Sequence, residues 1–112
     1  MATTFTDFRD GLGGDVCGRI GFDASTATGW RNFTARLREH DGSSGRLLAA
    51  AEEFSGVCSS GERIVLAAVL ASGGWNQDAD RICPGFWQRT LGSGMGEDVC
   101  RAVAAVLLRQ DA

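Results

Sequence analysis

The sequence contains no lysine and no tyrosine, and His40 is its only histidine among 112 residues. Lysine-based catalysis is therefore excluded, and few side chains remain that could exchange protons near neutral pH. No serine, cysteine or aspartate near His40 forms a motif that would use it as a catalytic base. We therefore predict no enzymatic activity and no catalytic residue. A small ligand-binding protein or enzyme that uses His40 is an alternative hypothesis.

Metal-binding spacing is also missing. The four cysteines are scattered without a C-x-x-C pair, so we expect small buried side chains rather than zinc ligands or disulfides. Asn76, Asp78 and Asp80 alternate like the first ligands of a calcium loop. Arg81 and Trp87, however, occupy the positions where that loop needs its glycine and its bidentate carboxylate. We predict no metal site.

The glycine-rich stretch GSGMG, residues 92–96, has the look of a phosphate-binding loop. A helix-like segment precedes it, whereas a dinucleotide fingerprint requires a strand there. Glu97 and Asp98 follow it and would repel a phosphate at the start of the next helix. The stretch is therefore interpreted as a connection between helices, and no cofactor is predicted.

No apolar run approaches the roughly 20 residues that a membrane-spanning helix needs. The first residues, MATTFTDFRD, show no charged segment followed by an apolar core, as a secretory signal would. The formal net charge of −3 gives no general attraction for nucleic acid. We expect a cytoplasmic protein without a membrane segment.

The longest apolar run extends from Ile64 to Ala71. Ser59 and Glu62 precede it with the S-x-x-E spacing of a capping box, which predicts a helix over about residues 60–72. A helix that is apolar on all sides is buried on all sides. A strand is the competing interpretation of a short apolar run, but the capping box and the interior alanines favour a helix.

Apolar residues elsewhere recur at helical spacing between glycines, which predicts one all-α domain over residues 1–112. We expect a compact bundle of five or six short helices around the central apolar helix at about 60–72. The flanking helices are expected from Thr3 or Thr4 to Gly13–Gly14, from Asp23 or Ser25 to about His40, from Ser43 or Ser44 to about Phe54, after Pro84, and from Glu97 with a stripe of Val99, Ala102, Val103, Val106 and Leu107.

Function is then expected to depend on exposed side chains. Arg31 and Arg38 share a helix face, Trp75 follows two glycines, and Trp87 adjoins Phe86 so that both cannot face one core. Arginine and tryptophan are enriched at binding hot spots, so these four residues are the predicted partner-binding site. We hypothesise a small non-enzymatic accessory, regulatory or inhibitor protein of bacterial or phage origin that binds another protein, with homodimer formation a further possibility.

The alternative is a regulator that binds nucleic acid through the Arg31, Arg36 and Arg38 face. Three arginines within eight residues suit phosphate contacts. A helix-turn-helix protein would carry a basic recognition helix after a short turn. Here the helix after Gly42 carries Glu52 and Glu53 with Arg46 as its one basic residue, which favours the protein partner.

Overall fold

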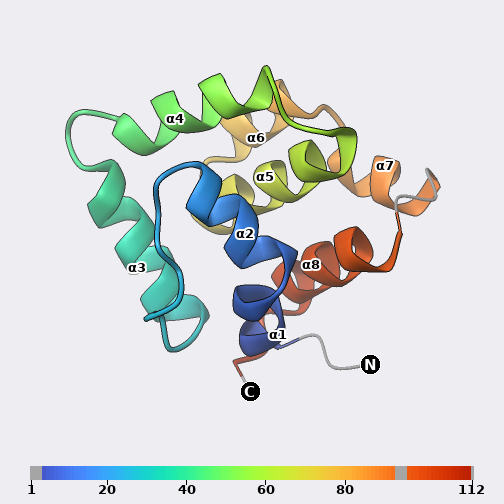
Figure 1. Cartoon of the computed structure of the whole chain (residues 1–112), viewed down its shortest axis with the longest axis horizontal. Coiled ribbons are helices and arrows are strands. Elements are labelled where there is room, and N and C mark those ends of the chain that lie inside the picture. The colour runs from blue at the N-terminus through green and yellow to red at the C-terminus, as the bar shows by residue number, and fades with distance from the viewer. Residues whose placement is uncertain (1–3, 93–95, 112) are drawn as a thin grey trace.

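The computed structural model describes residues 4–92 and 96–111, and within these the side chains of Trp87 and Leu91 are not described. This part of the chain forms eight helices and no strand, which confirms the all-α prediction (Figure 1). The helices are α1 (Phe5–Asp10), α2 (Leu12–Arg19), α3 (Trp30–Asp41), α4 (Arg46–Ser55), α5 (Ser60–Ser72), α6 (Asn76–Ile82), α7 (Phe86–Gly92) and α8 (Glu97–Leu108).

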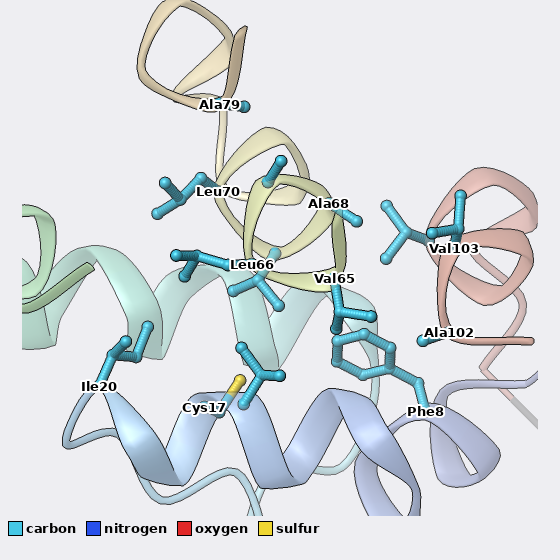
Figure 2. Packing of buried hydrophobic residues seen from close by; sticks show 14 of the residues in the cluster. Phe8, Cys17, Ile20, Val65, Leu66, Ala68, Leu70, Ala79, Ala102 and Val103 are labelled. Carbon is cyan, nitrogen blue, oxygen red and sulfur yellow. The ribbon is translucent and has the colours of Figure 1, made fainter. Parts of the chain in front are cut away.

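The α5 helix lies at the centre, and the helices in closest contact with it include α2, α4, α6, α7 and α8. Every side chain from Ile64 to Leu70 is at most 1% exposed. Figure 2 shows this helix between Cys17 and Ile20 of α2 on one side and Val103 of α8 on another. The predicted central helix is therefore confirmed.

The start of α5 follows the local sequence. The Ser59 backbone N–H donates to Glu62 Oε1 over 2.9 Å, and the Glu62 N–H donates to Ser59 Oγ over 3.2 Å. These reciprocal bonds satisfy two backbone N–H groups that have no acceptor within the helix. The bond from the Ser59 backbone also lowers the pKa of the Glu62 carboxyl.

The first predicted helix is wrong in its end point. Instead of stopping at Gly13–Gly14, the chain breaks at Gly11, and α2 runs through both glycines. A Cβ atom at Gly13 would overlap the Phe8 ring, and one at Gly14 would overlap the carbonyl oxygen of Arg9. These glycines therefore allow α1 and α2 to cross closely, which a reading of glycine as a stop signal could not anticipate.

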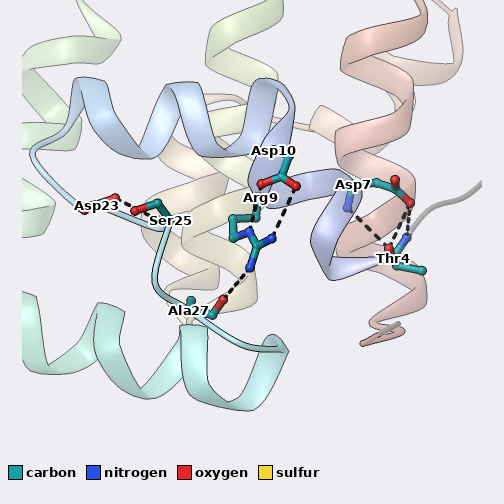
Figure 3. A network of polar contacts seen from close by, with 7 residues as sticks. All are labelled: Thr4, Asp7, Arg9, Asp10, Asp23, Ser25 and Ala27. Carbon is teal, nitrogen blue, oxygen red and sulfur yellow. Dashed lines mark hydrogen bonds and ion pairs between the residues drawn. The ribbon is translucent and has the colours of Figure 1, made fainter.

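The second predicted helix begins later than expected. Asp23 accepts a hydrogen bond from the Ser25 backbone N–H over 2.9 Å and forms a local turn rather than a helix start. Arg9 of α1 donates to the Ala27 carbonyl oxygen over 3.1 Å and fixes this irregular segment, as Figure 3 shows. Helix α3 therefore begins at Trp30.

The first turn of α3 is capped from the far end of the chain. Gly29 precedes the helix and offers no side chain, but Asp111 Oδ1 accepts from the Trp30 backbone N–H over 2.7 Å. The Gln110 carbonyl oxygen accepts from Trp30 Nε1 over 3.1 Å and from the Phe5 N–H over 2.7 Å. The C-terminal residues thus join the starts of α1 and α3.

A carboxylate of the preceding helix replaces the predicted cap of α4. Neither Ser43 nor Ser44 caps this helix. Asp41, the last residue of α3, accepts from the backbone N–H groups of Leu47 and Leu48 over 3.1 and 3.2 Å. The turn between the two helices is thereby fixed by one carboxylate.

The last part of the chain differs in two details. Asn76, Asp78 and Asp80, whose alternation resembles a calcium loop, lie on helix α6 instead. Leu107, expected in the buried stripe of α8, is 53% exposed because the stripe centres on Ala102, Val103 and Val106 and turns Leu107 away. The glycine-rich connection before α8 falls largely on residues 93–95, outside the described part.

Replacing Leu66 by alanine tests the central packing. Because Leu66 is 0% exposed, the cavity left behind should lower the free energy of unfolding by about 2–5 kcal/mol. Val57→Ala is the matched control, because Val57 is 80% exposed and its loss should change stability by less than about 0.5 kcal/mol. Urea unfolding followed by circular dichroism measures both. Equal effects would contradict the central position of α5.

Candidate functional site

The structure brings together two of the four predicted binding residues. The guanidinium carbon of Arg38, on α3, lies 5.5 Å from the centroid of the Trp75 ring, in the connection between α5 and α6. Arg38 is exposed and Trp75 is half-buried. A guanidinium over an indole face is attracted by the ring quadrupole and loses rotational freedom. Arg38 and Trp75 therefore form one partly exposed pair.

The two glycines before Trp75 make this pair possible. A Cβ atom at Gly73 would come within 2.6 Å of Trp75 Cζ3, so the ring lies directly on the backbone there. Gly74 adopts a φ of +94°, which L side chains rarely adopt, and a Cβ atom on it would overlap Arg38 Nη2. The sequence Gly73–Gly74–Trp75 thus holds the ring and leaves room for the guanidinium.

Arg109, the C-cap residue of α8, is not one of the four predicted binding residues but extends this surface. Its guanidinium lies 5.5 Å from the centroid of the Trp30 ring and donates to the Ser72 carbonyl oxygen and Thr34 Oγ1, each over 3.4 Å. Thr34 lies between Arg31 and Arg38 on α3. We call Arg31, Arg38, Trp75 and Arg109 the arginine–tryptophan surface.

Arg31 lies exposed in the first turn of α3. It borders an open depression of about 420 Å³ together with Thr28, Gly29, Asn32, Ala35 and Asp111. The Asp111 carboxylate in this depression already accepts the Trp30 N–H. Arg31 and Arg38 are seven residues apart, so they stand roughly 10 Å apart along the helix axis.

The positive charge of this surface is not neutralised within the described residues. Arginines on other helices, in contrast, do form ion pairs: Arg9 with Asp10, Arg81 with Glu52 and Asp78, and Arg101 with Glu97. No carboxylate in the same part of the chain forms an ion pair with Arg31, Arg38 or Arg109. An acidic protein with a net charge of −3 therefore presents a local basic surface.

Trp87 and Arg36 lie elsewhere. Helix α7, which carries Trp87, is at the opposite end of the longest axis from α3 (Figure 1), and the Trp87 side chain is not among those described. Arg36 points to another edge of α3 and donates to Thr26 Oγ1. Trp75 therefore lies beside Arg38, away from the helix that carries Trp87. Arg31, Arg36 and Arg38 do not share one face of α3.

Burial disfavours the reactive thiolate form of two of the four cysteines, Cys17 and Cys83. Cys17 is buried, and burial raises the pKa of its thiol to about 12. Burial also raises the pKa of the Cys83 thiol, against the opposing effect of Arg89 and Arg63. Cys58 is half-buried and Cys100 is exposed, so the expectation of four buried cysteines is wrong for Cys100. Raised thiol pKa values disfavour the nucleophilic thiolate.

No group of three or more histidine, cysteine, aspartate or glutamate side chains within residues 4–92 and 96–111 is placed to hold a metal ion. No helix in these ranges is both long and apolar enough to cross a membrane. Leu107 and Leu108 on α8 are 53% and 55% exposed, and they are apolar side chains that a homodimer could bury.

Comparison with known proteins adds no information on function, so the proposed function rests on the geometry of the arginine–tryptophan surface. No protein-family model matches the chain, and no curated protein or solved structure is significantly similar to it.

Replacing Gly73 by alanine tests how the Arg38–Trp75 pair is held. The added methyl group would push the indole away, so the upfield ring-current shift of the Arg38 side-chain protons should be lost. Overpacking should also cost about 1–3 kcal/mol of stability. Gly18→Ala is the control, because a Cβ atom there meets nothing within 4 Å. NMR spectra of both variants decide, and an unchanged Arg38 signal in Gly73→Ala would refute the packing described.

Proposed function

We propose that this protein acts by binding another protein, as a small non-enzymatic accessory, regulator or inhibitor. The observation that supports this function is the Arg38–Trp75 pair, which is partly exposed and has no ion-pair partner among the described residues. The bacterial or phage origin and the cytoplasmic location expected from the sequence remain part of this proposal.

The pair suits a binding surface for an energetic reason. A long side chain loses conformational entropy when a partner immobilises it. Arg38 has already lost part of that freedom because its guanidinium rests on the Trp75 ring between α3 and the glycine pair. A partner carboxylate that accepts from the free edge of the guanidinium would therefore gain a charge-assisted bond at reduced entropic cost.

Charge and spacing indicate the chemistry of the partner. Arg31, Arg38 and Arg109 favour an acidic segment, since opposite charges complement each other across an interface. The roughly 10 Å between Arg31 and Arg38 along the helix lies between the ~7 Å and ~13 Å that separate residues i and i+2 or i and i+4 on one face of an extended chain. An extended partner segment with carboxylates at one of these two spacings would direct both toward the arginines.

A nucleic-acid partner is the less favoured alternative. Nucleic-acid-binding proteins usually present a broad basic face, whereas this chain has a pI of about 5.0 and its Arg36 is bonded to Thr26 on another edge of α3 than Arg38. The half-buried Trp75 adds apolar area, which suits a protein surface better than a phosphate backbone.

The experiment is affinity capture from cells of the source organism with the wild-type chain, Arg38→Ala and Trp75→Ala as baits. Each substitution should reduce capture of the true partner at least about tenfold, as hot-spot truncation does. Arg101→Ala is the matched control, because it removes an exposed arginine from α8 that is already paired with Glu97. Quantitative mass spectrometry compares the baits, and isothermal titration with the purified partner then measures the affinities.

Three outcomes would contradict the proposal. Loss of cooperative thermal unfolding in Arg38→Ala and Trp75→Ala would show that they act through folding. Equal loss with Arg101→Ala would show a dependence on overall charge alone. Capture that disappears after nuclease treatment and falls steeply with salt would assign the surface to nucleic acid instead.

A further inference from the structure

The opposite edge of α3 carries a second cluster of cationic side chains. Phe22, Arg36, Glu39, His40 and Arg46 line an open depression of about 520 Å³. Arg36 and His40 are one helical turn apart on α3, and Arg46 begins α4. None of these residues belongs to the arginine–tryptophan surface.

Hydrogen bonds hold Arg46 in place. Its Nε donates to the His40 carbonyl oxygen over 2.6 Å, and its Nη2 lies 3.4 Å from His40 Nδ1. If Nη2 donates to Nδ1, a neutral His40 carries its proton on Nε2. The His40 ring also packs against the Phe22 ring, with centroids 5.6 Å apart and an angle of 66° between the planes. Arg46 and His40 are thus oriented by one another and by Phe22.

Arg36 is held in a similar way. One of its terminal nitrogens, Nη1, donates to Thr26 Oγ1 in the segment before α3. A guanidinium has five N–H donors, so most of the donors of Arg36 and several of those of Arg46 are left for another acceptor. The two side chains therefore offer oriented donors along the depression.

The nearby carboxylates do not neutralise these donors. Asp41 is directed to the first N–H groups of α4, where it accepts from Leu47 and Leu48. Glu39 borders the depression, but within the described residues it forms no ion pair with Arg36 or Arg46. Two guanidinium charges against one carboxylate leave the depression with a formal charge of +1 when His40 is neutral.

We propose that the Arg36–His40–Arg46 depression binds a phosphate group, either free phosphate or the terminal group of a small phosphomonoester. Guanidinium groups bind phosphate through paired N–H···O bonds, and the two arginines approach from different helices. His40 Nε2 supplies a third donor, and the Phe22 ring forms the apolar wall. This site extends the molecule beyond its proposed protein-binding role and does not depend on it.

The test is an NMR titration of the full-length, nitrogen-15-labelled chain with inorganic phosphate at constant ionic strength. The Nε signals of Arg36 and Arg46 should shift and saturate, and sodium chloride at the same ionic strength should leave them in place. Phenyl phosphate distinguishes the two sources. Tighter binding with shifts of the Phe22 ring signals identifies a phosphomonoester, whereas equal affinities identify free phosphate.

Three variants test whether the side chains of the depression hold the phosphate. Arg46→Gln should weaken phosphate binding about tenfold, because it removes a charge-assisted donor pair. Glu39→Gln should tighten binding about two- to fivefold, because it removes the opposing charge, and a gain of affinity cannot come from unfolding. Arg101→Gln removes a positive charge on α8 and should leave the affinity unchanged.

Two results would overturn the proposal. Signal shifts that never saturate, or that chloride reproduces, would show only general ionic attraction. An affinity that Glu39→Gln does not raise, or that Arg101→Gln lowers as much as Arg46→Gln does, would show that the cluster does not hold the phosphate.

Discussion

The side chains from Ile64 to Leu70 are shielded from water on every side of α5, so each neighbouring helix must present an apolar face to it. At one contact, α5 and α8 approach each other so closely that only a glycine fits. A Cβ atom on Gly61 of α5 would lie 2.9 Å from the Val99 side chain of α8. The polar residues are thereby displaced to the outer elements. Both proposed sites therefore lie on helices that border the core from outside, and α3 contributes residues to each.

Aromatic contacts and residues near the end of the chain hold α3 in position. The Trp30 ring lies 5.1 Å from Phe5 and 5.0 Å from Phe8, measured between centroids. Gln110 and Asp111 bind the Trp30 side chain and backbone in turn. Because α3 contributes Arg31, Arg38, Arg36 and His40, the geometry of both proposed sites depends on contacts that α3 makes with Phe5, Phe8, Gln110 and Asp111.

Local patterns predicted the elements whose causes are local. The capping box at Ser59 and the apolar run behind it place α5 correctly, and helical spacing identifies the buried residues Phe33 and Leu37. The predicted helix boundaries are wrong where a group distant in the sequence determines the local structure. Gly13 was predicted to end a helix, but a glycine is needed there because the Phe8 ring packs against it, a contact that the sequence does not reveal. The start of α3 was predicted too early because the first turn is capped by Asp111, far along the chain. Arg38 and Trp75 were chosen singly by residue type, but their contact is a property of the fold.

The unneutralised charge of α3 has an origin in its own sequence, WRNFTARLREHD. On α8, Glu97 lies one turn before Arg101 and pairs with it, as helical spacing favours. On α3, the residue one turn after Arg38 is Asp41, whose carboxylate is drawn to the N–H groups of α4 because these would otherwise lack an acceptor. Capping α4 therefore removes the carboxylate that would have neutralised Arg38. The same contact that fixes the turn between α3 and α4 leaves the basic surface open to a partner.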